Sequence, residues 1–248
     1  MKPALVIAGL DPSGGAGILL DIKVFSFFKI PTAGVITANT VQNSCGAFGY
    51  EVTDGKLFAE QLLKLKEDFS FGVIKVGMLA KGEFLELTLS TFEGVNAVVD
   101  PVMYSKNGKP LVDNPLIYKT LAERIFLITP NLEEAKILTE TETDDPLKLG
   151  KLLKELGFKN VLLKGGHLQD PKKVRDYLFT EDGEILTFER KRVDKTPRGT
   201  GCLISSAIAA LYLKTGDLKS AFFKAEEFVG KVLEKALKLG KCYEILTF

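Results

Sequence analysis

The hydrophobic positions of this chain fall into two alternating patterns. Short continuous runs rich in Val and Ile are typical of strands buried on both faces of a sheet. These runs occupy residues 5–9, 33–36, 73–76, 97–99, 125–128 and 161–163. Between them lie segments with helical spacing of apolar residues, which predicts helices at 18–25, 57–69, 83–92, 116–122, 132–138 and 147–156. Strands that alternate with helices predict a mostly parallel sheet with helices on both faces.

The pattern changes after Lys164. Two short apolar runs, at 176–179 and 185–188, flank a polar turn and predict a β-hairpin, which would form an antiparallel edge of the sheet. Two long helices are predicted to follow, at 201–213 and 218–239, where Gly216 ends the first and Asp217 caps the second. We therefore expect an α/β fold with a central, mostly parallel sheet and an antiparallel edge.

Polar residues and glycines follow most of the predicted strands. They are Asp11, residues 37–39, residues 77–78, Asp100, residues 129–131 and residues 164–167. In open parallel sheets, ligands bind beyond the carboxyl ends of the strands. The sequence therefore predicts one crevice for a small molecule at this edge of the sheet.

A glycine-rich turn, Pro-Arg-Gly-Thr-Gly-Cys at 197–202, leads directly into the first of the two long helices. The free N–H groups and the positive dipole end of such a helix start predict an anion hole. The same helix end is expected to lower the pKa of the Cys202 thiol. The glycine spacing matches neither a Rossmann fingerprint nor a P-loop. A glycine-assisted helix start that binds nothing is the alternative interpretation.

A second glycine-rich turn, at residues 10–17, joins the first strand to the first helix. Its glycines allow the backbone to approach a ligand closely, and Asp11 and Asp21 place carboxylates at and just beyond the turn. The alternative is an ordinary tight connection between a strand and a helix.

Asn131 and Glu134 stand three positions apart at the start of a predicted helix. This spacing is that of a capping box, in which the two side chains satisfy free N–H groups at the helix start. It equally suits residues near a Mg²⁺ ion, because proteins hold Mg²⁺ through few carboxylates together with substrate phosphates. The sequence leaves both interpretations open.

Composition narrows the class of protein. With 248 residues and 46% hydrophobic content, we expect one domain over residues 1–248. The net charge of +1 gives no basic excess, so we expect neither nucleic acid nor a membrane surface as partner. The three cysteines are widely spaced, which argues against a disulfide framework or a zinc site. No apolar run has the length of a membrane span, and we expect a reducing, cytoplasmic location.

The residues named so far also occur together, and in the same order, in a known family. The shared motifs are DPSGGAG at 11–17, Thr37-Ala38 with Gln42-Asn43, KVGML at 75–79, DPVM at 100–103, TPNL at 129–132 with Glu134, KGGH at 164–167 and GTGC at 199–202. On these motifs the chain resembles the hydroxymethylpyrimidine/phosphomethylpyrimidine kinases of thiamine biosynthesis, which have a ribokinase-like fold. The likeness covers nearly the whole chain.

The resemblance implies phosphoryl transfer from MgATP to 4-amino-5-hydroxymethyl-2-methylpyrimidine, and then to its monophosphate. It implies a pyrimidine pocket of Gly9, Asp21, Gln42, Met78 and Val102, in which Asp21 and Gln42 hydrogen-bond to the aminopyrimidine edge. It also implies ATP-binding residues Asn131, Lys164 and Arg198, Mg²⁺ near Asp100 and Glu134, and catalysis by Gly199, Thr200, Gly201 and Cys202. A homodimer is the implied assembly.

Cys202 stands where most ribokinase-like sugar kinases have an aspartate base. We hypothesise that Cys202 assists deprotonation of the hydroxymethyl group in the first transfer, whereas the second nucleophile is already an anionic phosphate. A purely structural Cys202 is the alternative. The chain departs from the family at Arg198, where a histidine is usual; this arginine would contact phosphate or would be a solvated surface charge.

Three other functions compete with this interpretation. Pyridoxal kinase has the same fold, and its substrate is also a flat heteroaromatic ring with a hydroxymethyl group. A hydrolase would use Cys202 with His167, and a pyrimidine-sensing protein would need Asp21 and Gln42 but not Lys164 or Cys202. Residues 43–49 and 104–109 are polar and glycine-containing, and we expect them to be loops able to close over the site.

Overall fold

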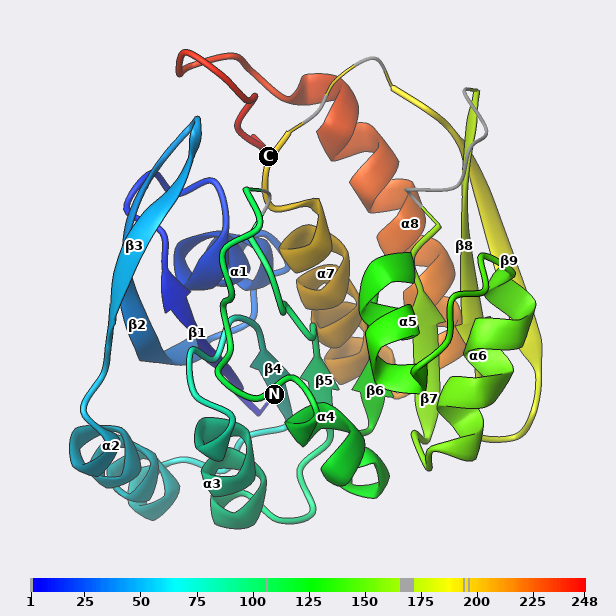
Figure 1. Ribbon diagram of the computed structural model, residues 1–248. Coiled ribbons are helices and arrows are strands. Elements are labelled where there is room, and N and C mark those ends of the chain that lie inside the picture. Colours follow the sequence, from blue (N-terminus) through cyan, green and yellow to red (C-terminus); the bar gives the residue numbers. More distant parts are fainter. Residues whose placement is uncertain (1, 106, 166–171, 194, 196) are drawn as a thin grey trace.

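The computed structural model describes residues 2–105, 107–165, 172–193, 195 and 197–248, and within these residues the chain forms a nine-stranded sheet (Figure 1). The spatial order of the strands is β3-β2-β1-β4-β5-β6-β7-β8-β9. Their bounds are β1 Ala4–Leu10, β2 Thr32–Asn43, β3 Gly46–Val52, β4 Val73–Val76, β5 Ala97–Val99, β6 Leu127–Ile128, β7 Asn160–Leu163, β8 Lys173–Phe179 and β9 Ile185–Lys191. The strands from β2 to β7 in this order pair in parallel, whereas β3, β8 and β9 pair antiparallel to their neighbours.

Helices cover both faces of the sheet (Figure 1). Their bounds are α1 Gly17–Phe27, α2 Gly55–Asp68, α3 Glu83–Thr91, α4 Ile117–Thr120, α5 Leu132–Thr139, α6 Pro146–Glu155, α7 Thr200–Thr215 and α8 Leu218–Lys235. Strand β1 shows why the chain folds in layers, because its side chains alternate between two cores. Leu5 and Ile7 pack in the core with α2 to α6, whereas Val6 and Ala8 pack in the core with α1, α7 and α8.

The predicted fold class is confirmed, with differences in detail. The segment 43–49, expected to be a loop, is largely strand: β2 continues to Asn43 and β3 begins at Gly46, which adds a second antiparallel edge. The last helix ends at Lys235, and the helix expected at 116–122 is a short α4 followed by a 3₁₀ turn at Ala122–Arg124. No helix among the described residues is long and apolar enough to cross a membrane.

The expectation that the widely spaced cysteines would form no disulfide was wrong. Cys45 and Cys242, which are 197 positions apart, form a disulfide that joins the β2–β3 turn to the C-terminal segment. A backbone hydrogen bond from Tyr243 N to Ser44 O lies beside it. The spacing of cysteines along the chain could not reveal this pair, because the pairing depends on where the C-terminal segment lies in the fold.

Candidate active site

A cavity of about 560 Å³ opens at the carboxyl ends of the central strands. Almost all of the predicted site residues line it. They are Gly9, Gln42, Met78, Asp100, Val102, Asn131, Glu134, Lys164, Arg198, Gly199, Thr200, Gly201 and Cys202. The structure thus brings the two glycine-rich turns and the polar strand ends together in one place, as the sequence predicted for a parallel sheet.

The start of α7 forms one wall of this cavity. Gly199 precedes the helix with a φ of 78°, a conformation that favours glycine. A Cβ atom at this position would lie 2.2 Å from the carbonyl oxygen of Gly15, in the other glycine-rich turn. No side chain caps the helix start within the described structure, so its first N–H groups remain available to an anion. This geometry is compatible with the anion hole, which stays a prediction.

The start of α1 lies against the same cavity. Gly17 has a φ of 59°, and a Cβ atom there would lie 2.3 Å from the carbonyl oxygen of Gly9. Ala16 and Gly17 line the cavity, and Asp11 shapes the preceding turn by accepting hydrogen bonds from the backbone N and the hydroxyl of Ser13. Glycine is therefore needed here because the turn passes so close to β1.

An ion pair crosses the floor of the cavity. Lys164 Nζ, after β7, lies 2.7 Å from Asp100 Oδ1, after β5, and the Asp100 side chain is only 3% exposed. Thr129 Oγ1 donates to the same carboxylate oxygen at 3.3 Å. A Cβ atom on Gly201 would lie 3.2 Å from both Lys164 Nζ and Asp100 Oδ2, so the pair lies directly beside the anion hole. This arrangement places a cation beside the start of α7.

Glu134 forms the predicted capping box, and its carboxylate also faces the cavity in which a Mg²⁺ site was predicted. Its carboxylate accepts from Asn131 N at 2.8 Å and its own N–H donates to Asn131 Oδ1 at 2.9 Å, so the capping box is present. The same carboxylate also lines the cavity near Lys164 and Asp100. Burial raises the pKa of Glu134 to about 7, although Lys164 opposes this shift. A role of Glu134 beside Mg²⁺ stays a prediction.

The raised pKa of Glu134 predicts a pH-dependent contribution to stability. A group whose pKa is higher in the folded than in the unfolded chain loses its stabilising effect as the pH rises through the folded value, here about 7. We therefore expect wild type to lose stability relative to Glu134→Gln as the pH rises from about 4.5, the ordinary pKa of glutamate, to about 7, measured as the free energy of unfolding in urea. Glu133→Gln, which changes an exposed carboxylate in the same helical turn, is the control. If the free energies of unfolding of wild type and Glu134→Gln differ by the same amount at every pH, the prediction is wrong.

Cys202 lies on the cavity wall, but its expected pKa was wrong. Burial raises the pKa of the Cys202 thiol to about 12, even though Lys75 and the N–H of Gly17 favour the thiolate. Desolvation outweighs both of these opposing effects, and the start of α7 does not contribute the expected lowering of the pKa. At neutral pH the thiol is therefore protonated.

Asp21 is the exception among the predicted site residues. Its side chain is fully buried, and its two carboxylate oxygens accept from Lys75 Nζ and from Ser206 Oγ, each at 2.8 Å. Asp21 is not among the residues that line the cavity. The expected hydrogen bond from Asp21 to a substrate ring therefore finds no support in the geometry.

Lys75 is the residue whose importance the sequence analysis missed. It is fully buried in β4, where it pairs with Asp21. A signal was present in the sequence, because a lysine inside the apolar run 73–76 must find a buried partner. What the sequence does not tell is which carboxylate provides that partner.

Arg198 is not a solvated surface charge. Its side chain is buried to 8% exposure, and Nη1 donates to the carbonyl oxygen of Asn43 at 2.8 Å. Its backbone N donates to Glu244 O in the C-terminal segment. Arg198 thus links the β2–β3 turn to the cavity wall, and its contact with phosphate stays a prediction. His167 lies outside the described residues, as does Lys106 in the second predicted loop.

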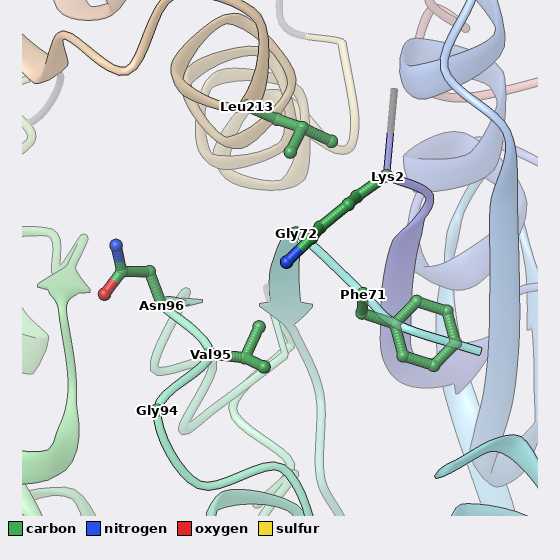
Figure 2. Close-up of a pocket in the computed structure, with 7 residues that line it drawn as sticks. All are labelled: Lys2, Phe71, Gly72, Gly94, Val95, Asn96 and Leu213. Atoms are coloured by element: carbon green, nitrogen blue, oxygen red, sulfur yellow. The ribbon is translucent and has the colours of Figure 1, made fainter. Parts of the chain in front are cut away.

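A second cavity, of about 370 Å³, lies at the opposite end of the sheet (Figure 2). It is lined by Lys2, Phe71, Gly72, Gly94, Val95, Asn96 and Leu213. Several of these residues immediately precede β4 and β5, so the cavity faces the amino ends of the strands. Lys2 is its single charged lining residue among those described, and no group of catalytic side chains converges there. The cavity at the carboxyl ends is the better candidate site.

The layered α/β fold, with an uncapped glycine-led helix facing a lysine–aspartate pair in one cavity, defines a ribokinase-like small-molecule kinase. The family model for phosphomethylpyrimidine kinase matches residues 11–246. The chain belongs to this phosphomethylpyrimidine kinase family.

Individual relatives agree with this assignment. The chain is 39% identical over 256 residues to the hydroxymethylpyrimidine/phosphomethylpyrimidine kinase of Aquifex aeolicus (strain VF5), covering 99% of each protein. Among solved structures, it is similar to a phosphomethylpyrimidine kinase from Clostridium difficile 630, with a TM-score of 0.79, 30% identity and coverage of 93% and 99% of the two chains. It is also similar to a pyridoxal kinase of Bacillus subtilis solved with ADP, with a TM-score of 0.87, 29% identity and coverage of 100% and 97%.

Proposed function

We propose that this protein transfers a phosphoryl group from ATP to the hydroxymethyl group of 4-amino-5-hydroxymethyl-2-methylpyrimidine, and then transfers a second one to the monophosphate. Its place would be in thiamine biosynthesis, as for the relatives named hydroxymethylpyrimidine/phosphomethylpyrimidine kinase. The observation that carries the proposal is the glycine-led start of α7, which shares one cavity with Gln42 and Met78 on one side and Lys164 on the other.

The pyrimidine is assigned to the end of the cavity formed by β1, β2 and the segments after β4 and β5. Gln42 offers an amide that can pair with the aminopyrimidine edge, and Met78 and Val102 offer apolar contact to the ring. A Cβ atom on Gly9 would lie 2.8 Å from Met78 Sδ, so a larger residue at this position would displace the Met78 side chain.

The phosphates are assigned to the anion hole and to Asn131, Lys164 and Arg198. Phosphoryl transfer needs positioning and neutralisation of charge on the oxygens, which backbone N–H groups and a lysine supply. The donor set also fits Mg²⁺: Asp100 and Glu134 are two cavity carboxylates, and the described residues contain no group of three or more metal-ligating side chains. Two carboxylates suit an ion bound together with substrate phosphates, which it would neutralise.

In this proposal Cys202 accepts the proton of the substrate hydroxyl in the first transfer. This role predicts that kcat of the first transfer depends on pH. Because the thiol has a pKa of about 12, its thiolate fraction rises tenfold for each pH unit between 7 and 9. We expect kcat of the first transfer to rise with pH in wild type and to stay flat in Cys202→Ala. The second transfer should stay flat in both, since a phosphate monoester, with a second pKa of about 6, is already anionic. Equal slowing of both transfers by Cys202→Ala would contradict this division of roles.

Pyridoxal kinase is the second candidate function. The observation that favours it is the similarity to the Bacillus subtilis pyridoxal kinase over the full chain. One ring atom or methyl group changes transition-state binding in an apolar pocket by only about 1–3 kcal/mol, so both rings could be accepted. Purified protein incubated with MgATP and either the pyrimidine alcohol or pyridoxal tests this directly. A higher kcat/KM for pyridoxal, or the absence of a pyrimidine diphosphate, would overturn the primary proposal.

We further propose that residues 1–248 form one ribokinase-like kinase domain, and that the protein is a homodimer in the cytoplasm. The single continuous sheet of the described residues supports the first part. Light scattering on the purified chain would report the assembly, and a monomer at micromolar concentration would contradict the dimer.

A further inference from the structure

A buried ion pair lies behind the wall of the active-site cavity. Lys75 Nζ, on β4, lies 2.8 Å from Asp21 Oδ2, on α1, and neither side chain is exposed. Ser206 Oγ, on α7, donates to Asp21 Oδ1, also at 2.8 Å. These three side chains therefore join α1 and α7, the two helices that begin at the glycine-rich turns, to β4.

Stability alone does not account for this pair. Burying each charge costs several kcal/mol, and replacing a buried ion pair by apolar residues is often neutral or stabilising. The position of Lys75 suggests a use in the site. A Cβ atom on Gly77 would lie 2.8 Å from Lys75 Nζ, so the ammonium group lies against the backbone next to Met78, which lines the cavity.

The pair also acts on Cys202. Ser206 follows Cys202 by four residues, so the two lie on the same face of α7, one turn apart. The ammonium group of Lys75 lowers the pKa of the Cys202 thiol, whereas the carboxylate of Asp21 raises it. Asp100, after β5, raises it further, and the N–H of Gly17, at the start of α1, lowers it. Removing Lys75 should therefore raise the pKa of the thiol, and removing Asp21 should lower it.

We propose that Asp21, Lys75 and Ser206 form a positioning unit that fixes the starts of α1 and α7 relative to each other and sets the reactivity of the Cys202 thiol through the balance of its two charges. The three residues act through Cys202 and the helix starts and do not touch the substrate. The consequence for phosphoryl transfer rests on the proposed function. The change in the reactivity of the Cys202 thiol does not depend on the proposed function.

The test is the alkylation of Cys202 by iodoacetamide, in which the thiolate sulfur displaces iodide. Cys202 is the free cysteine of the described structure, since Cys45 and Cys242 are joined, so the label reports on it alone. Asp21→Asn leaves Lys75 beside the thiol without its carboxylate, and we expect alkylation at pH 8 to become about tenfold faster, equivalent to one pKa unit. Lys75→Met leaves Asp21 without its cation, and we expect alkylation to become slower by a similar factor.

Two controls separate this effect from general loss of structure. Cys202→Ala should take up no label. Leu149→Ala, in the buried face of α6, should lower the melting temperature and leave the alkylation rate unchanged. If Asp21→Asn and Lys75→Met shift the rate in the same direction, or if neither shifts it, the proposal is wrong.

The double variant Asp21→Asn/Lys75→Met keeps the proposal testable if a single variant fails to fold. It leaves no unpaired charge, so we expect it to melt above either single variant. Because the link between α1 and α7 is lost, we expect kcat of the first transfer to stay at least tenfold below wild type with little change in KM. A double variant with restored stability and wild-type kcat would overturn the positioning role. Absence of any phosphoryl product from wild type would instead count against the proposed function and leave the alkylation result standing.

Discussion

Replacing Gly199 by alanine is expected to lower kcat by about 10²–10³-fold, the range seen when a preorganised donor to a transition-state anion is lost. The residue has a φ of 78°, and an added Cβ atom would lie 2.2 Å from Gly15 O and 2.5 Å from Leu20 Cδ2. Backbone and core atoms cannot both give way by that amount, so the start of α7 must move. The N–H groups that face the cavity move with it. Steady-state kinetics with MgATP would measure the effect.

Gly216 at the other end of α7 offers a matched control. It also has a positive φ, of 69°, but nothing lies within 4 Å of a Cβ atom placed there. Gly216→Ala should therefore destabilise the fold by about 1 kcal/mol through backbone strain and leave kcat unchanged. Equal losses of activity in the two variants would show that the geometry of the helix start is not what matters.

The layers of the fold could be predicted because the strands carry a strong local signal. Central strands such as β1 and β4 are buried on both faces, so their sequences are continuous apolar runs. The convergence of the site followed from one rule, that the carboxyl ends of parallel strands meet at one edge. This rule brought Asp100, Asn131 and Lys164 together correctly, although they lie far apart in the sequence.

The features of the site that the sequence did not predict depend on side-chain orientation and on opposing contributions to a pKa. Asp21 is near a glycine-rich turn in the sequence, but the rotation of α1 about its axis turns its side chain toward Lys75 and away from the cavity. For Cys202, desolvation raises the pKa whereas Lys75 and the N–H of Gly17 lower it, and the degree of burial decides which effect is larger. Neither quantity is contained in local sequence patterns.

The β2–β3 hairpin was missed for a related reason. The fully buried residues of β2 lie only within 35–38, after which exposed residues alternate with half-buried ones. Strand β3 contains two glycines, so the periodic signal of the hairpin is weak. The segment is held in place by distant partners: Arg198 bonds to Asn43 O, and Cys45 is joined to Cys242. Because Gln42 belongs to this hairpin, these long-range contacts help to position one wall of the proposed ring site.

Removal of the lysine at the cavity floor is expected to have an effect as large as that of Gly199→Ala. Lys164→Met takes away the cation beside the anion hole, and we expect kcat to fall by about 10²–10³-fold. It also leaves the Asp100 carboxylate, 3% exposed, without its partner, which should destabilise the fold by about 3–5 kcal/mol. Kinetics at saturating MgATP and urea unfolding would measure the two effects separately.

Lys164→Met should also shift the pKa of Glu134 in a known direction. Lys164 lowers the pKa of Glu134, so its removal should raise that pKa further above 7, and the loss of stability should continue to a higher pH than in wild type. Lys64→Met, which breaks an ion pair between exposed side chains on α2, should change neither activity nor this pH dependence, and should change stability by about 1 kcal/mol or less. If Lys164→Met lowered stability by no more than Lys64→Met, the Asp100 carboxylate would have another partner, and the proposed phosphate site would lose the cation on which it depends.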